Sequence, residues 1–364
     1  MNLKGFQMNV GILGMPLSGK TTLFNLLTSQ RKQMDSFLST KSKNIGVIKI
    51  IDDRLDYLSS LHQDKKTIYV TLEIVDIPGI STEIPEKQKQ EIFSQIQNTD
   101  ALLIVIRVFE DETIPGDNNP VQQLENLVYE IILRDLELIE NRINRLAPDK
   151  RKLTIQEENE KRILARCEQH LSDNSLLVNL SLSEEELKML SGYGFFSLKP
   201  IIVVLNLDEE QLRHNKFSHQ EKFYQLLREY QMACISISGK IEMEINELEE
   251  EEKLLFLEEL GFKESGIQRL TQTLYQHLGL ISFFTIGKDE IKAWTLRRGT
   301  TALKAAGKVH SDMERGFIRA EIVDFNNFRD LGSMQKVKEK GLLKVEGKEY
   351  LIEDGNIVYF RFNV

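Results

Sequence analysis

Short apolar runs recur along the first three quarters of the chain, and stretches with helical spacing separate several of them. Continuous apolar runs of this length are typical of strands that are buried on both faces of a parallel sheet. Their alternation with helices predicts a doubly wound, mostly parallel α/β domain. The predicted strands are Asn9 to Leu13, Tyr69 to Val75, Ala101 to Val108, Ile201 to Leu205 and Ala233 to Ile237.

A different pattern lies between the third and fourth of these strands. From 121 to 146 the apolar residues Leu124, Leu127 and Ile131 repeat at helical spacing in a charged background. A second helical stretch around Ile163 to Leu171 follows. This pattern predicts a helical hairpin inserted into the α/β domain.

Beyond residue 280 the pattern changes to short strands and glycine turns, which predicts a small α+β domain. The strands expected there are 283–285, 341–345, 350–352 and 357–362. The expected domains are therefore an α/β domain in two parts, 8–120 and 200–280, the inserted hairpin 121–199, and a C-terminal domain 281–364.

Composition narrows the class of protein. The chain has 364 residues, 41% of them hydrophobic, which is enough for two or three domains with cores. No apolar run approaches the roughly 20 residues that cross a bilayer, and the first seven residues lack the apolar core of a signal peptide. Only Cys167 and Cys234 are present, which fits a reducing compartment. We expect a soluble, cytoplasmic protein with no membrane partner.

The net charge of −9 argues against a protein that coats nucleic acid indiscriminately, and sequence-specific DNA is not an expected partner. Residues 281–364 differ, with 15 Lys and Arg against 12 Asp and Glu. This weak excess makes the C-terminal segment the best place for an RNA-facing surface, but an ordinary solvated face is the better explanation of it.

The strongest chemical signal follows the first predicted strand. The sequence there matches the phosphate-loop pattern G-x-x-x-x-G-K-[ST] between a strand and a helix. Backbone N–H groups of such a loop surround a polyphosphate, the lysine supplies positive charge and the threonine hydroxyl binds Mg²⁺. The predicted nucleotide-binding residues are Gly14, Met15, Pro16, Leu17, Ser18, Gly19, Lys20, Thr21 and Thr22.

Besides the threonine hydroxyl, a carboxylate that holds Mg²⁺ through water is expected at the end of a buried strand. Asp76 occupies that place, and the amide of Gly79 is suited to sensing a γ-phosphate. We therefore predict Thr21 and Asp76 as metal-binding groups, and Lys20 and Gly79 as catalytic groups. Ras-like GTPases carry a water-orienting glutamine at the next position, but this chain has Ile80.

GTPases read guanine with an Asn-Lys-x-Asp motif after a later strand. Here the strand ends in Asn206, Leu207, Asp208 and Glu209, so the aspartate is replaced by a longer side chain and the lysine by leucine. This change predicts weakened guanine recognition. Asn206, Leu207, Glu209, Ser238 and Gly239 are the predicted contacts to the base.

With these motifs the sequence resembles the YchF/Obg-like ATPases, a branch of the P-loop GTPase class, over nearly its whole length. Specific matches lie in the C-terminal third: EIKAWT at 290–295, ERGFIRAE at 314–321 and the terminal FRFNV at 360–364. The resemblance implies a TGS-type β-grasp domain at the C-terminus. It also implies Mg²⁺-dependent hydrolysis of ATP in preference to GTP, coupled to association with ribosomes or other translation components.

The chain departs from the family pattern in three places. Leu17 stands where the family usually has asparagine, and hydrocarbon cannot coordinate a monovalent cation. The first switch is only partly recognisable, with Thr40 as the candidate Mg²⁺ ligand and Ser39 as the alternative. The glycine-rich second switch is replaced by the acidic segment 81–88, which predicts slow hydrolysis.

Three functions remain open from the sequence. The first is an ATP-preferring hydrolase that acts as a switch, and the second is a nucleotide-sensing scaffold with negligible turnover. The absence of both the glutamine and the glycine-rich switch favours the scaffold. The third function is a conventional GTPase, which Leu207 and Glu209 disfavour.

Overall fold

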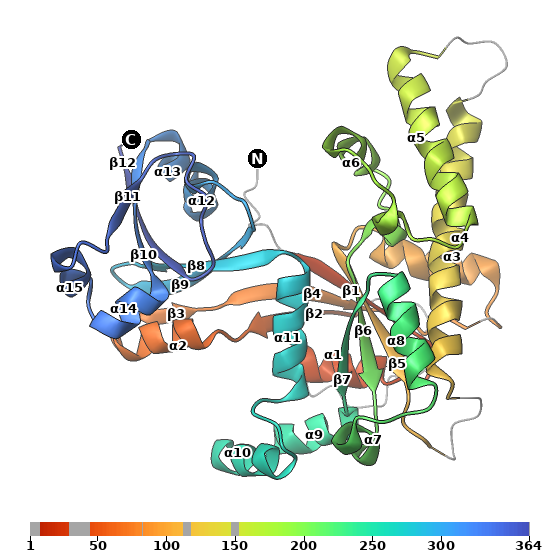
Figure 1. Cartoon of the computed structure of the whole chain (residues 1–364), viewed down its shortest axis with the longest axis horizontal. Helices are drawn as coiled ribbons and strands as arrows, with labels where there is room; N and C mark the ends of the chain where they lie inside the picture. The colour runs from red at the N-terminus through yellow and green to blue at the C-terminus, as the bar shows by residue number, and fades with distance from the viewer. Residues whose placement is uncertain (1–7, 29–43, 82, 112–117, 147–152, 364) are drawn as a thin grey trace. The chain divides into compact units, whose positions relative to one another are not determined.

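The computed structural model describes residues 8–28, 44–81, 83–111, 118–146 and 153–363 (Figure 1). Its compact parts are two units, one containing 8–47 and 73–270 and the other containing 48–72 and 271–364, within the described residues. This division differs from the expected boundary at residue 281, because 48–72 belong to the same unit as the C-terminal residues.

A six-stranded sheet of order β2-β4-β1-β5-β6-β7 organises the first unit. The pairs β1–β4, β1–β5, β5–β6 and β6–β7 are all parallel, as the continuous apolar runs predict. Every residue of β5 and β6 is buried. The strands are β1 Asn9–Gly14, β2 Asn44–Ile50, β4 Val70–Asp76, β5 Ala101–Arg107, β6 Ile201–Asn206 and β7 Ala233–Ile237.

The first unit also contains helices, and apolar residues of several of them, including α3, α4 and α8, form one continuous core with the strands. The helices are α1 Lys20–Thr28, α3 Glu86–Ile96, α4 Pro120–Leu146, α5 Ile155–Ser172, α6 Glu184–Leu190, α7 Glu209–His214, α8 Gln220–Glu229, α9 Gly239–Glu247, α10 Glu250–Glu259 and α11 Gly266–His277, with short 3₁₀ turns η2 Leu177–Asn179 and η3 Phe196–Leu198. None of the helices in the described residues is long and apolar enough to cross a bilayer.

The predicted helical hairpin is present as α4 and α5, which lie side by side in Figure 1. Thr154 begins α5 with a capping box, in which its hydroxyl accepts from the N–H of Glu157 and the Glu157 carboxylate accepts from the N–H of Thr154. The root of the hairpin is fixed by Asp135 of α4, which is fully buried and accepts hydrogen bonds from the N–H groups of Phe196 and Ser197.

The second unit contains a mixed six-stranded sheet of order β11-β10-β12-β8-β9-β3. Its core includes a helix with alanines at 302, 305 and 306 packed against Phe283 and Phe360. The elements are α2 Asp53–Ser60, β3 Lys66–Ile68, β8 Leu280–Ile286, β9 Glu290–Arg297, α12 Ala302–Val309, α13 Ser311–Arg315, β10 Phe317–Asp324, α14 Phe325–Leu331, α15 Met334–Glu339, β11 Lys344–Glu346 and β12 Asn356–Phe362.

The structure confirms the predicted fold class and corrects several strands. Strands β2, β3, β9 and β10 were not predicted from the sequence, and the expected strand at 350–352 is reduced to an isolated bridge between Thr301 and Leu351. The edge strand β3 pairs in parallel with β9, more than 200 residues later in the chain. A pairing at this separation leaves no signal in a local pattern, because only the fold brings the two strands together.

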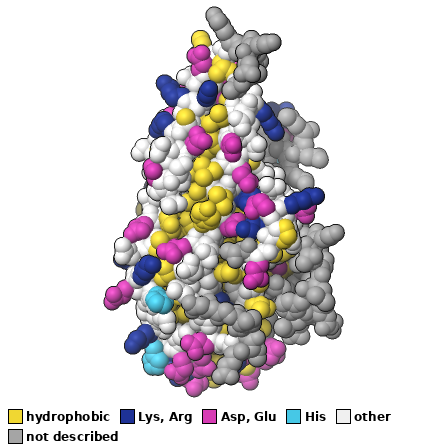
Figure 2. Space-filling model, turned by 90° about the vertical axis from the view of Figure 1, so that its right-hand side faces the viewer, with side chains coloured by type: hydrophobic (Ala, Val, Ile, Leu, Met, Phe, Trp, Pro, Cys, Tyr) yellow, Lys and Arg dark blue, Asp and Glu magenta, His cyan; other side chains and the backbone are white. Residues whose placement is uncertain are grey.

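Surface charge is mixed. Figure 2 shows Lys and Arg side chains interspersed with Asp and Glu side chains on one face of the molecule.

Candidate functional site

The phosphate loop lies at the carboxyl end of β1, where ligands bind in open α/β sheets. β1 ends at Gly14 and α1 begins at Lys20, so five residues connect strand and helix. Gly19 has φ +93°, and a Cβ atom there would lie 2.2 Å from Nδ2 of Asn206. Glycine is therefore required at this position both by the backbone conformation and by the space available.

Leu17 lies in the exposed part of this loop. Its φ is +60° and the residue is 54% exposed. This left-handed conformation is costly for a leucine and far less costly for asparagine or glycine. The backbone at this position therefore favours asparagine, the residue that the resemblance implies, over leucine.

Lys20 is buried at the start of α1. Its ammonium group donates a hydrogen bond to the carbonyl of Met15 at 2.8 Å, and the residue is only 6% exposed. Burial lowers the pKa of Lys20 to about 8, although the nearby Asp76 carboxylate opposes the shift. A lysine buried in this way gains most from an anionic ligand, which would replace the solvation that the folded chain removes.

Asp76 ends β4 and lies beside the phosphate loop because Ile12 of β1 pairs with it in register. The hydroxyl of Thr21 donates to Asp76 Oδ2 at 3.4 Å. Burial raises the pKa of Asp76, while Lys20 and hydrogen bonds from Thr21 and Asn44 lower it. The other carboxylate oxygen, Oδ1, is buried without a partner among the described residues.

These groups fit a magnesium ion. A hydroxyl and a carboxylate with a free oxygen are oxygen ligands of the kind that Mg²⁺ prefers, and Mg²⁺ usually takes only one or two protein ligands together with phosphates and water. No group of three His, Cys, Asp or Glu side chains able to hold a metal by themselves occurs in the described part of the chain. Thr40 and its alternative Ser39, predicted from the first switch, lie outside the described residues.

The segment after Asp76 contacts the phosphate loop directly. The N–H of Ile80 donates to the carbonyl of Gly14 at 3.0 Å. A Cβ atom on Gly79 would lie 2.6 Å from the backbone nitrogen of Pro16, so only glycine fits there. The side chain of Ile80 is buried in the core and carries no group that orients water.

On the opposite side of the loop, the predicted base-reading segment has a structural role as well. The amide of Asn206 donates to the carbonyl of Ser18 at 3.1 Å and accepts from the N–H of Gly239 at 3.0 Å. Asn206 therefore links the phosphate loop to the start of α9. Ser238 caps this helix, and Thr22 of α1 lies against Gly239.

Leu207 and Glu209 are placed very differently from each other. Leu207 is 1% exposed and packs in the core, whereas the Glu209 side chain is 54% exposed and forms an ion pair with Arg213 at 3.0 Å. Asp208 between them caps α7 by accepting from the N–H of Gln211. The carboxylate predicted to face the base is thus solvated and held by a neighbouring arginine of its own helix.

A charged cluster next to the phosphate loop was not predicted from the sequence. Lys89 of α3 forms a buried ion pair with Glu130 of α4, and Arg134 pairs with Glu86. Glu130 lines a small cavity together with Met15 of the phosphate loop, two residues that follow β4 and two further residues of α4. The signal available in the sequence was the presence of Glu130 and Arg134 on the same helical face as the apolar residues of α4.

The fold and the site together define a P-loop nucleotide-binding protein of the GTPase class. A family model for 50S ribosome-binding GTPases matches residues 9–142, and the YchF-GTPase_C model, described as a protein of unknown function (DUF933), matches residues 280–363. The chain belongs to the YchF family.

Full-length relatives carry this conclusion. The ribosome-binding ATPase YchF of Bacillus subtilis is 37% identical, with 98% of this chain and 100% of the relative covered. The protein of the same name from Escherichia coli O157:H7 is 34% identical over 97% of this chain and 99% of its own length. The solved structure of the Schizosaccharomyces pombe YchF GTPase superposes with a TM-score of 0.85 at 26% identity, covering 98% of both chains.

Proposed function

We propose that this protein is a Mg²⁺-dependent P-loop nucleoside-triphosphate hydrolase that prefers ATP to GTP and acts as a switch on the ribosome. The observation that carries the proposal is the pair of buried groups at the phosphate loop. Lys20 of the loop is buried near Asp76 at the end of β4, and one oxygen of the Asp76 carboxylate has no partner among the described residues. Two buried groups of opposite charge, each incompletely solvated, suit a site that is completed by a phosphate and a metal ion.

In the proposed mechanism Lys20 would bind the phosphate oxygens, and backbone N–H groups of the loop would surround the β-phosphate. Magnesium, when bound, supplies positive charge against the leaving and transferred phosphates. Thr21, Thr40 and Asp76 would hold it, Asp76 through water. The Gly79 amide would contact the γ-phosphate, and the loss of that phosphate would release the segment that leads into α3.

Ile80 affects the expected rate of nucleotide hydrolysis. Its buried hydrocarbon side chain cannot orient the attacking water, so intrinsic hydrolysis should be slow. This residue also supports the alternative of a nucleotide-sensing scaffold with negligible turnover. Single-turnover hydrolysis with and without ribosomes separates the two: acceleration by ribosomes would exclude the scaffold, and the absence of hydrolysis under both conditions would exclude the enzyme.

The preference for ATP is supported by the base side of the site, where Leu207 is buried and Glu209 is paired with Arg213. Several relatives are named ribosome-binding ATPases, but the matched family model and the solved relative are named GTPases. We would titrate the protein side by side with non-hydrolysable ATP and GTP analogues in Mg²⁺. Tighter binding of GTP would establish the conventional GTPase instead.

The ribosome is proposed as the macromolecular partner because the bacterial relatives are named for binding it. We accordingly propose a cytoplasmic location, where this partner would be found. The helical hairpin within 121–199 and the β-grasp domain within 281–364 are the proposed contact regions. Co-sedimentation with ribosomes, with the ATP analogue and without nucleotide, tests the assignment; equal absence from the ribosome pellet in both states would contradict it.

A further inference from the structure

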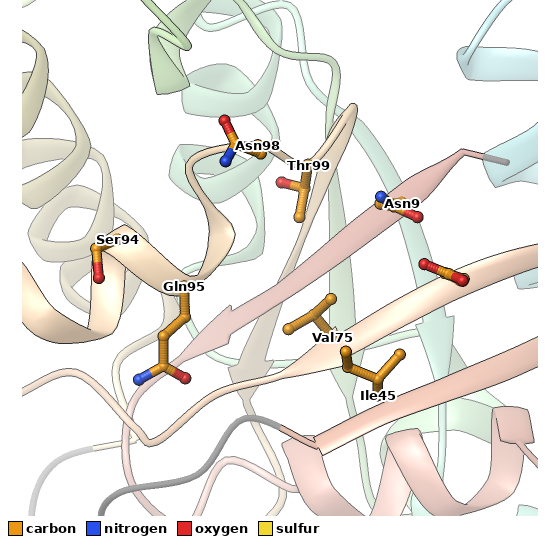
Figure 3. Close-up of a pocket in the computed structure, with 8 residues that line it drawn as sticks. Asn9, Ile45, Val75, Ser94, Gln95, Asn98 and Thr99 are labelled. Atoms are coloured by element: carbon orange, nitrogen blue, oxygen red, sulfur yellow. The ribbon is translucent and has the colours of Figure 1, made fainter. Parts of the chain in front are cut away.

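A second cavity lies away from the phosphate loop, between α3 and the sheet. Its volume is about 320 Å³. Its walls come from β1, β2 and β4 on one side and from the end of α3 and the turn after it on the other (Figure 3). Figure 3 shows Ile45 and Val75 next to each other, with Ser94 and Gln95 on one side of them and Asn9 on the other.

The lining of this cavity combines an apolar floor with oxygen acceptors. Ile45 and Val75 supply the hydrocarbon surface, and Asn98 and Thr99 add polar groups. Two side-chain oxygens from lining residues, Oδ1 of Asn9 and Oε1 of Gln95, are buried without a hydrogen-bond partner among the described residues. A buried acceptor without a partner destabilises the protein, so a ligand that brings hydrogen-bond donors would recover this free energy.

Charge decides which kind of donor fits. Glu73 is the one ionisable residue among those that line the cavity, and no ion pair to it is formed within the described ranges. Asp100 lies close by and accepts from the backbone N–H of Asn9 at 2.9 Å. The Lys199 ammonium interacts with Asp100 and offsets its charge, so Glu73 supplies the negative charge of the lining. This charge and the oxygen acceptors together disfavour phosphates and carboxylates as ligands.

We propose that this cavity binds an alkylguanidinium or alkylammonium group. The charged head would donate to Glu73, Asn9 and Gln95, and the methylene stem would lie on Ile45 and Val75, as the stems of Lys and Arg do on apolar surfaces. The group could come from a free amine of the arginine or polyamine class, or from a side chain of a bound protein. This inference goes beyond the nucleotide chemistry and does not depend on it.

An occupant of the cavity would contact elements that also belong to the nucleotide site. Val75 immediately precedes Asp76, and α3 continues the segment that starts at Gly79. The carboxyl end of α3 is held by Lys199, whose ammonium group donates to the carbonyls of Ile96 at 3.1 Å and Gln97 at 2.6 Å. A cation in the cavity would therefore stabilise one position of α3.

Calorimetric titration of the full chain with agmatine and spermidine tests the proposal. We expect binding that Glu73→Gln weakens by about tenfold or more, because it removes the charge that the head group would contact. The matched control is Glu91→Gln, an exposed carboxylate on α3 that does not line the cavity. No binding by the natural chain, or equal binding by Glu73→Gln, would show a water-filled cavity only and overturn the proposal.

If Glu73→Gln does not fold, as judged by its thermal unfolding against that of Glu91→Gln, then Gln95→Met serves instead. This change keeps the side-chain length and removes the buried oxygen, and it should weaken agmatine binding as well; unchanged binding would overturn the proposal.

Ribosome co-sedimentation then distinguishes the sources of the cation. Competition by agmatine and by acetyl-arginine amide, together with weaker ribosome binding by Glu73→Gln, would identify a protein side chain. Ribosome binding that is unaffected by agmatine would identify a free amine.

Discussion

The two sides of the candidate nucleotide site are built in different ways. On the phosphate side, Lys20 and Asp76 are buried and already in contact with the loop. On the base side, the Glu209 carboxylate is 54% exposed and paired with Arg213. Preorganised buried groups lose little entropy when a ligand binds, whereas an exposed, paired side chain must first reorganise. We therefore expect affinity to come from the phosphates and only modest selectivity from the base.

The largest loss of nucleotide affinity is expected from a substitution on the phosphate side of the site. Lys20→Ala should weaken the binding of ATP and GTP analogues alike, by about 100-fold, because a charge-assisted hydrogen bond to phosphate is lost. Fluorescence titration measures it, with the exposed Lys161→Ala on α5 as the matched control. An unchanged dissociation constant would remove Lys20 from the site.

Asn206 joins the two sides, so its removal should affect both nucleotides equally. Asn206→Ala leaves the Ser18 carbonyl and the Gly239 N–H without their partner, and we expect about tenfold weaker binding and a loss of about 1–2 kcal/mol in the free energy of unfolding. Denaturant unfolding and the same titration measure the two effects. The exposed Asn326→Ala should change neither. A loss confined to one nucleotide would instead make Asn206 a reader of the base.

The pH dependence of binding reports on the burial of Lys20. Its pKa of about 8 in the free protein means that it loses its proton as the pH rises above 8, whereas a bound phosphate would keep it charged. Affinity for the ATP analogue should be level below pH 8 and then fall by up to about tenfold per pH unit. Lys20→Ala should abolish this fall; a fall that persists in the variant would belong to another group.

A substitution on the base side should change nucleotide selectivity by less than the Lys20 substitution changes affinity. Glu209→Asp breaks the pair with Arg213 and places the shorter carboxylate that guanine-reading motifs use, so the GTP-to-ATP affinity ratio should rise by about threefold to tenfold. Glu210→Asp, at the neighbouring exposed position, is the control. If Glu209→Asp leaves an already tight GTP affinity unchanged, the protein is a conventional GTPase.

The smallest effect concerns the backbone of the loop. Leu17→Asn should raise the free energy of unfolding by about 1 kcal/mol, because asparagine tolerates the left-handed conformation at φ +60°. Leu17→Ala keeps the Cβ atom and should bring no such gain. Thermal unfolding compares the two variants, and equal stability would show that the strain is absorbed elsewhere.

Local motifs explain which parts of the site were predictable. The phosphate loop and Asp76 are each encoded within a few residues, and the parallel strands that precede them have a clear apolar pattern, so their proximity follows from the fold class. The resemblance to the YchF/Obg-like family also came from contiguous motifs, and family membership is confirmed by full-length relatives. The assignments of Lys20, Gly79, Thr40 and the base contacts to their roles stay predictions.

The remaining features depend on contacts between distant residues. Asn206 reaches Ser18 across 188 positions, Lys199 holds the end of α3, and β3 joins the sheet of the C-terminal unit through β9. The cavity lined by Glu73 likewise collects residues from three strands and one helix.

The sequence by itself determined the class of fold, the phosphate loop and the family, because apolar periodicity and short motifs act over a few residues. Only the tertiary structure decided which polar groups are buried, which are paired and which remain without a partner. Those properties arise when desolvation and packing bring distant segments together, and no local pattern records them.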